Sequence, residues 1–93
     1  MTGTTGRITR RADVTLTRTG GEALLVDERG GSVHVVNGTA ARLWELCERS
    51  PTIEELAESL ATSYELMETD VRRDVEKMVE TLEGLGLLEK GTA

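Results

Sequence analysis

The chain has few of the residues from which catalytic centres, metal sites and disulfide frameworks are built. Its 93 residues include one cysteine and one histidine. A single cysteine excludes an internal disulfide framework and fits a reducing, cytosolic environment. The single histidine, His34, has no neighbouring set of ligands, so the sequence predicts no metal site. Glycine-rich phosphate-binding motifs are missing as well, and we expect no bound cofactor.

Long apolar segments are also missing. No run in the sequence approaches the ~20 apolar residues that span a bilayer. Residues 1–13 lack the apolar segment of a secretory signal peptide. A chain of this length is expected to form one domain with a single modest core. We therefore expect a soluble, cytoplasmic protein with no membrane partner.

Acidic side chains outnumber basic ones, and the excess lies outside the N-terminal segment. The formal net charge is −6. Residues 1–12 contain three arginines and no acid, so residues 13–93 carry 8 basic and 17 acidic side chains, a net charge of −9. Nucleic-acid binding depends on neutralising phosphates, which a domain this acidic repels, so we expect no nucleic-acid partner. Residues 1–12 have no hydrophobic period and indicate a disordered tail before a folded domain at 13–90.

Three short segments have the alternation or composition of β-strands. They are "DVTLTR" (13–18), "EALLV" (22–26) and "SVHVV" (32–36). Glycine-containing turn signals, "TGG" and "DERGGS", separate them. Short loops between successive strands predict an antiparallel meander.

Helical spacing begins at Asn37-Gly38-Thr39. Three apolar stripes follow, one on each of three predicted helices. They include Leu43 and Trp44 on the first helix, Leu56 and Leu60 on the second, and Val75 and Val79 on the third. "TIEE" has the S/T-x-x-E spacing of a capping box at the start of the second helix. Three strands followed by three helices predict an α+β domain, with one three-stranded antiparallel sheet against a helical layer.

This order resembles a winged helix-turn-helix, a fold that often reads DNA with its third helix. From residue 68 to residue 83, however, six acidic residues stand against Arg72, Arg73 and Lys77. That excess of acid opposes the approach of phosphate. A winged-helix DNA-binding regulator is therefore kept only as the alternative function.

The reactive residue types do not combine into a catalytic site. Cys47 shares a helical stripe with Leu43 and Trp44 and is expected to be a small core residue. Trp44 is expected to be buried, with a partner for its indole N–H. The many carboxylates lie away from the apolar stripes, where nothing predicts a pocket that separates their pKa values. We therefore predict no catalytic residues and no enzymatic activity.

The third predicted strand has an unusual pattern. Val33 and Val35 face one side of it, and His34 and Val36 face the other, so neither face is fully polar. A strand at a sheet edge also presents unpaired N–H and C=O groups. An extended peptide added to this edge would satisfy them. Alternatively, a helix covers one face and the strand is simply core.

Six short motifs in order resemble the PqqD family. They are Val36-Asn37, Gly38-Thr39-Ala40-Ala41, Leu43-Trp44, Thr52-Ile53-Glu54-Glu55-Leu56, Asp74-Val75 and Gly86-Leu87-Leu88. Together they cover nearly all of the chain after its N-terminal segment. Val36 replaces the leucine that is usual before the asparagine, and His34 stands where a larger aromatic is frequent.

The resemblance implies a recognition element for ribosomally made peptides. Such domains bind the leader segment of a precursor peptide and present its core to a modifying enzyme, such as a radical SAM protein or a leader peptidase. The leader adds to the third strand and lies against the third helix. Carried to this sequence, the implied contacts are Ser32, Val33, His34, Val35, Val36, Val71, Arg72, Val75, Met78 and Val79.

Two questions stay open on the sequence alone. Members of the family serve pyrroloquinoline quinone synthesis, lasso peptides and other radical-modified products, and the residues do not choose among them. The same free strand edge could also pair with its twin, so we expect a monomer or a weak homodimer.

Overall fold

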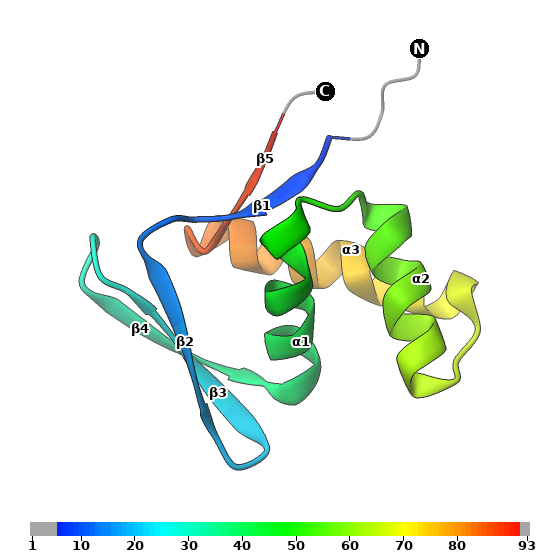
Figure 1. The fold of residues 1–93 in the computed structure, drawn as a ribbon, viewed down its shortest axis with the longest axis horizontal. Helices are drawn as coiled ribbons and strands as arrows, with labels where there is room; N and C mark the ends of the chain where they lie inside the picture. The colour runs from blue at the N-terminus through cyan, green and yellow to red at the C-terminus, as the bar shows by residue number, and fades with distance from the viewer. Residues whose placement is uncertain (1–5, 92–93) are drawn as a thin grey trace.

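A computed structural model describes residues 6–91 of the chain. Three strands form an antiparallel sheet in the order β2-β3-β4 (Figure 1): β2 at Val14–Thr19, β3 at Glu22–Asp27 and β4 at Ser32–Asn37. The predicted meander is confirmed. Gly20 and Gly31 adopt positive φ in the two hairpin turns, a conformation that disfavours residues with a Cβ.

The helices also follow the predicted order. α1 spans Gly38–Leu46 and continues into a short 3₁₀ helix, η1, at Cys47–Arg49; α2 spans Ile53–Tyr64 and α3 spans Glu68–Gly84. All of them lie on one side of the three-stranded sheet (Figure 1). The α+β class and the sheet-then-helices architecture predicted from the sequence are confirmed.

At the start of two helices, a side chain accepts a hydrogen bond from a backbone N–H group that has no partner within the helix. The Asn37 side chain accepts from the Ala40 N–H at 2.8 Å, which fixes the corner between β4 and α1. Thr52 and Glu55 form the predicted capping box at the start of α2. α3 begins after Met67 without a side-chain cap.

The expectation of a disordered segment over residues 1–12 is wrong for residues 8–10. Ile8–Arg10 form strand β1, which pairs antiparallel with β5 at Leu88–Lys90 in a second, two-stranded sheet. Ile8 is fully buried, and its N–H donates to the Pro51 carbonyl at 2.8 Å. Arg7 and Arg11 beside this strand also make backbone hydrogen bonds, with Gly91 and Leu87. Residues 1–5 of the expected tail lie outside the described residues. The packed unit thus includes residues before 13.

The core lies between the sheet and the helices, and Trp44 of α1 links it to the two-stranded sheet. The Trp44 indole N–H donates to the Leu87 carbonyl just before β5, at 3.1 Å. The Arg10 guanidinium of β1 lies 4.5 Å from the centre of the Trp44 rings. The buried partner expected for the indole N–H is therefore a backbone carbonyl. Within residues 6–91, no helix is both long and apolar enough to cross a membrane.

Candidate functional site

The outer edge of β4 is open. All six residues of β4 pair with β3, from Asp27↔Ser32 to Glu22↔Asn37. In an antiparallel pair, every second residue directs its N–H and C=O away from the neighbouring strand. Across residues 6–91 no strand pairs with that edge, because β1 and β5 pair with each other instead. β4 thus presents alternate backbone donors and acceptors to an additional strand.

The two faces of β4 differ in burial. On the inner face, Val36 is buried opposite Ala23, and the half-buried His34 ring hydrogen bonds the Ser32 hydroxyl at 3.1 Å. On the outer face, Val33 and Val35 are 58% and 64% exposed. Apolar side chains therefore occur on both faces, as the sequence predicts. The valines of the outer face are not covered by any helix in the described part of the chain.

Three of the contacts expected on α3 are core residues. Val71, Val75 and Val79 are buried, and together with Leu82 they form the stripe that packs α3 against the rest of the domain. A ligand could not contact Val75 or Val79 directly, because both have no exposed surface. These valines position α3, and Val79 also forms part of the wall of a cavity beside β1 and β5.

Arg72 lies on the flank of α3 that is near α2 and the β1–β5 sheet. Its guanidinium pairs with the Glu54 carboxylate of α2 at 3.4 Å. It also lines a cavity of about 540 Å³ together with Ile8 and Lys90, which places this flank beside the β1–β5 sheet. No residue of β4 lines this cavity.

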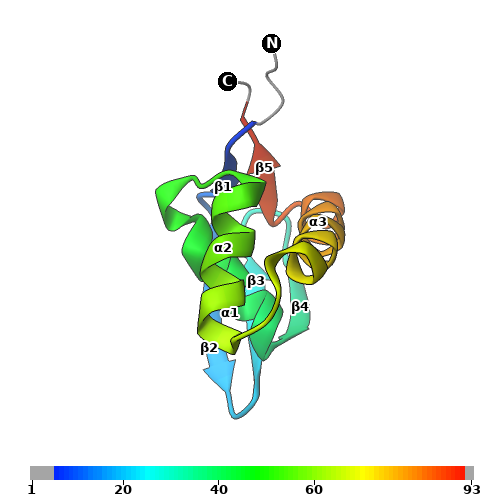
Figure 2. The ribbon, with the colours of Figure 1, turned by 90° about the vertical axis from the view of Figure 1, so that its right-hand side faces the viewer.

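The flank of α3 on the other side of the buried valines carries Met78, the one contact expected on α3 that is half-buried at the margin of the core. Asp74, Thr81 and Leu85 lie at helical spacing around it, and Leu85 is 41% exposed. Figure 2 shows β4 and α3 on the same side of the molecule, with β1 and β5 above them. The sequence contained the signal for this flank in the spacing of Asp74, Met78, Thr81 and Leu85.

Cys47 is buried, as expected of a core residue. Burial raises the pKa of its thiol from 9.0 to about 12, and the nearby positive charge of Arg10 lowers it only in part. The thiol therefore stays protonated at neutral pH, whereas a nucleophilic cysteine needs an accessible thiolate. Cys47 and Trp44 belong to the scaffold.

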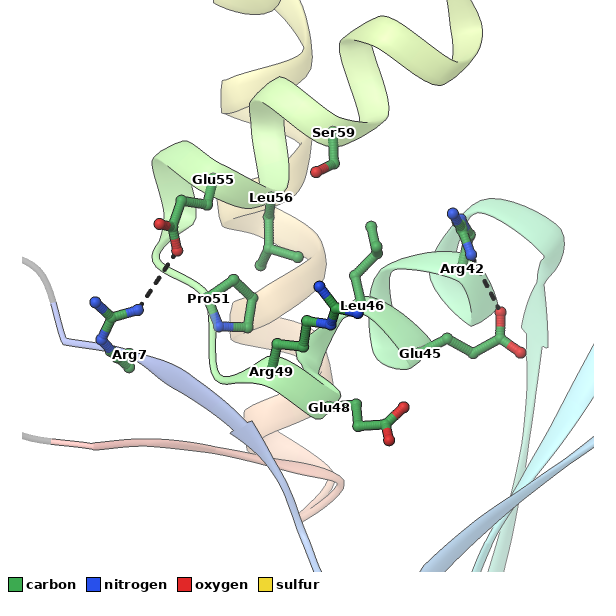
Figure 3. A pocket seen from close by; sticks show the side chains of 10 residues that line it. All are labelled: Arg7, Arg42, Glu45, Leu46, Glu48, Arg49, Pro51, Glu55, Leu56 and Ser59. Atoms are coloured by element: carbon green, nitrogen blue, oxygen red, sulfur yellow. Dashed lines mark hydrogen bonds and ion pairs between the residues drawn. The ribbon is translucent and has the colours of Figure 1, made fainter.

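A second cavity, of about 550 Å³, lies between α1, η1 and α2 (Figure 3). Arginine and glutamate side chains surround its opening, where Arg7 pairs with Glu55 at 3.5 Å and Arg42 with Glu45 at 4.0 Å. Exposed pairs of this kind stabilise little. No residue of β4 lines the cavity, and its three arginines and three glutamates balance one another in charge.

The arrangement of the meander, the helices and the open strand agrees with what the sequence motifs implied. A family model for coenzyme PQQ synthesis protein D (PqqD) matches residues 22–88. The chain belongs to the PqqD family. The match begins at β3 and ends in β5, so it includes β4 and α3 in full. No curated protein sequence matches the chain.

Two solved structures share the fold of this PqqD-family chain. One is TbiB1 in complex with the TbiA(beta) leader peptide, with a TM-score of 0.75 and 22% identity over 87% of this chain and 94% of that one. The other is a lasso peptide synthetase B1 complexed with its leader peptide, with a TM-score of 0.74 and 25% identity over 89% of this chain and 98% of that one. The similarity extends over most of each chain.

Proposed function

We propose that this PqqD-family chain binds the leader segment of a ribosomally made precursor peptide and delivers it to the enzyme that modifies or cleaves the precursor. The leader adds as a fourth strand to the open edge of β4. The observation that carries the proposal is this edge, whose alternate backbone groups pair with no other strand in the described part of the chain. The complexes of two solved structures of the same fold with leader peptides support it.

Backbone hydrogen bonds supply part of the affinity. Three of the six residues of β4 point their N–H and C=O outward, and each bond that a peptide makes there contributes about 1 kcal/mol net. This contribution depends little on the sequence of the peptide. Strand addition therefore explains binding but not the choice of peptide.

Side chains on the inner side of the added strand supply specificity. Successive residues of a strand point to opposite faces, so every second leader residue points toward α3. There it meets the half-buried Met78 and the exposed Leu85, with His34 and Ser32 at the strand. We propose that an apolar leader residue packs on Met78 and Leu85. The carboxylate of Asp74 on the same flank favours a neighbouring polar or basic residue.

The chain acts in this proposal as a carrier and not as a catalyst. Its one cysteine is buried and protonated at neutral pH. The exposed acids of α3 also weigh against the alternative of a DNA-binding regulator, because phosphates would meet Asp70, Asp74 and Glu80.

The proposal is tested with a synthetic leader segment of the short precursor encoded beside this chain. We expect Leu85→Ser to weaken leader binding at least tenfold, because the replacement removes an apolar contact on the β4 side of α3. Arg72→Ser, on the other flank, should stay within twofold of the unchanged protein. Fluorescence anisotropy measures both affinities. Equal effects of the two substitutions would place the peptide elsewhere, and no binding by the unchanged protein would contradict the function itself.

A further inference from the structure

The hydrogen-bond register of the sheet shows which backbone groups of β4 point to its open edge. The Glu28 N–H, one residue after β3, donates to the Asp13 carbonyl on the side of β2 at 2.9 Å. Backbone groups alternate in direction along a strand, so every second residue of β3, counted back from Asp27, is turned to β4. The partners of those residues are the even-numbered residues of β4. The N–H and C=O groups of Val33 and Val35 therefore point to the open edge.

His34 lies between these two valines, with its side chain on the inner face of β4. For a leader that runs antiparallel to β4, Val33 and Val35 belong to hydrogen-bonded pairs, and His34 belongs to the non-hydrogen-bonded pair between them. The Cα atoms of such a pair are only about 4.5 Å apart, which brings the two side chains close together. The leader residue opposite His34 is thus the one placed to contact the imidazole.

The imidazole of His34 has one nitrogen in use and one available. Its Nε2 is 3.1 Å from the Ser32 hydroxyl, and this hydrogen bond restrains the half-buried ring. Nδ1 has no hydrogen-bond partner within residues 6–91. No unpaired side-chain nitrogen or oxygen is buried in that part of the chain, so Nδ1 is accessible. A leader strand laid beside β4 would cover Nδ1 and exclude water from it.

The other leader contacts proposed above are mainly apolar. They are Val33 and Val35 on the strand and Met78 and Leu85 on α3. Apolar contacts discriminate weakly between side chains of similar size. A polar group that is covered without a hydrogen-bond partner rejects its ligand more strongly, because the cost of removing its water is not recovered. The choice between leaders should therefore depend on His34 more than on the apolar contacts.

We propose that His34 is the specificity-determining residue for the leader, and that the leader residue opposite it carries an uncharged hydrogen-bonding side chain, an amide or a hydroxyl. This inference rests on the proposed leader-binding function. Amide and hydroxyl groups both donate and accept, so they fit Nδ1 whether or not it carries a proton. An ammonium group only donates and fits one of these states.

A carboxylate at the same leader position is disfavoured by Asp27. The Asp27 side chain lies on the inner face of the sheet, paired with Ser32, which is the residue that hydrogen bonds His34. Its Oδ1 accepts from the N–H groups of Arg29 and Gly30 at 3.1 and 3.0 Å, which holds the carboxylate in the turn after β3. A second carboxylate beside it would be repelled.

The test exchanges asparagine and leucine, which are similar in size and shape, at each residue of a synthetic leader in turn. The leader is that of the short precursor encoded beside this chain, and fluorescence anisotropy measures each affinity. With the unchanged protein, we expect asparagine to bind about tenfold more tightly than leucine at one position. With His34→Leu, the preference at this position should reverse, with leucine tighter by about threefold. A purely structural role of His34 would weaken all leaders alike and reverse nothing.

Three variants serve as controls. His34→Asn keeps a hydrogen-bonding group and should keep the preference for asparagine at the same leader position. Ser32→Ala removes the restraint on the ring and should reduce that preference to about threefold. Thr17→Leu adds an exposed apolar side chain on β2, with β3 and β4 between it and the open edge, and should leave all preferences unchanged. Circular dichroism and the urea midpoint establish that each variant folds as the unchanged protein does.

The results that would overturn the inference differ from the one that would remove the proposed function. If His34→Leu reversed the preference at no leader position, His34 would not select the leader, although strand addition would stand. If glutamate or lysine at the coupled position bound more tightly than asparagine, the assignment of an uncharged side chain would be wrong. Failure of the unchanged protein to bind any of the leaders would contradict the leader-binding function itself.

Discussion

The two sheets of this small domain differ in what their exposed and buried parts contribute. The two-stranded β1–β5 sheet is attached to the core by Ile8, by the hydrogen bond from Trp44 to the Leu87 carbonyl and by Arg10 over the Trp44 rings. The three-stranded sheet has an open edge with Val33 and Val35 exposed. The first arrangement contributes stability, and the second leaves hydrogen-bonding groups available for a ligand. Stability and binding should therefore respond to different substitutions.

The largest effect expected from this comparison is on stability. Ile8→Ala removes fully buried methyl groups and should lower the free energy of unfolding by about 2–4 kcal/mol, since a cavity remains. Val35→Ala removes methyl groups from an exposed surface and should cost less than about 1 kcal/mol. Urea unfolding measures both. An equal loss of stability would contradict the separation of the two sheets.

Leader affinity should show the reverse order in the same two variants. Val35→Ala weakens binding severalfold because an outward leader side chain loses its neighbour on β4, whereas folded Ile8→Ala binds normally. Anisotropy titrations are made at a temperature where both variants are folded. Weak binding by Ile8→Ala alone would move the binding surface to the β1–β5 sheet.

Alkaline pH provides a smaller test of the buried cluster around Trp44. The pKa of Cys47 is raised to about 12 in the folded protein, so the thiol ionises more readily in the unfolded chain. Below pH 9 the thiol is protonated in both the folded and the unfolded chain, and its full contribution to the free energy of unfolding is present. That contribution is lost as the pH rises toward 12, because the unfolded chain loses its thiol proton first. At pH 10 the loss from this one group is about 1.4 kcal/mol. Stability of Cys47→Ala measured from pH 8 to 10 should fall less steeply than that of the unchanged protein, and identical slopes would contradict the pKa shift.

The smallest expected effect concerns Arg10. Arg10→Gln removes the cation above the Trp44 rings and should lower the free energy of unfolding by about 0.5–1 kcal/mol, because the contact is partly solvated. Arg18→Gln, which breaks an exposed pair with Glu45, is the matched control with a smaller expected loss. Urea midpoints compare them. A larger loss for Arg18→Gln would show that the contact with Trp44 contributes little.

Local patterns predicted most of the fold. The alternation of the strands, the capping box at Thr52 and the apolar stripes of the helices depend on neighbours in sequence, so they can be read without the structure. Strand β1 could not be predicted this way. A segment of three residues is too short to show the alternation of a strand. These residues adopt strand structure because they pair with β5 and because Ile8 is buried.

Only part of the candidate site could be predicted, because the rest also depends on tertiary packing. β4 was identified because apolar residues occur on both faces of the strand. On α3, the resemblance to the family implied contacts at Val75 and Val79, but both lie on the apolar stripe that faces the core and are buried. The rotation of α3 within the fold decides which of its flanks stays exposed. It leaves Met78 half-buried and Leu85 exposed on the flank opposite Arg72, and the sequence alone does not give this rotation.

Strand addition at β4 is tested most directly by methylating the leader backbone one nitrogen at a time and measuring each affinity. An added strand directs every second N–H to β4, so methylation should weaken binding at least tenfold at alternate residues over a window of about six. The residues between them should tolerate methylation within about twofold to threefold. Loss at alternate positions is the result that the account predicts. Uniform tolerance along the leader, or loss with the spacing of a helix, would contradict it.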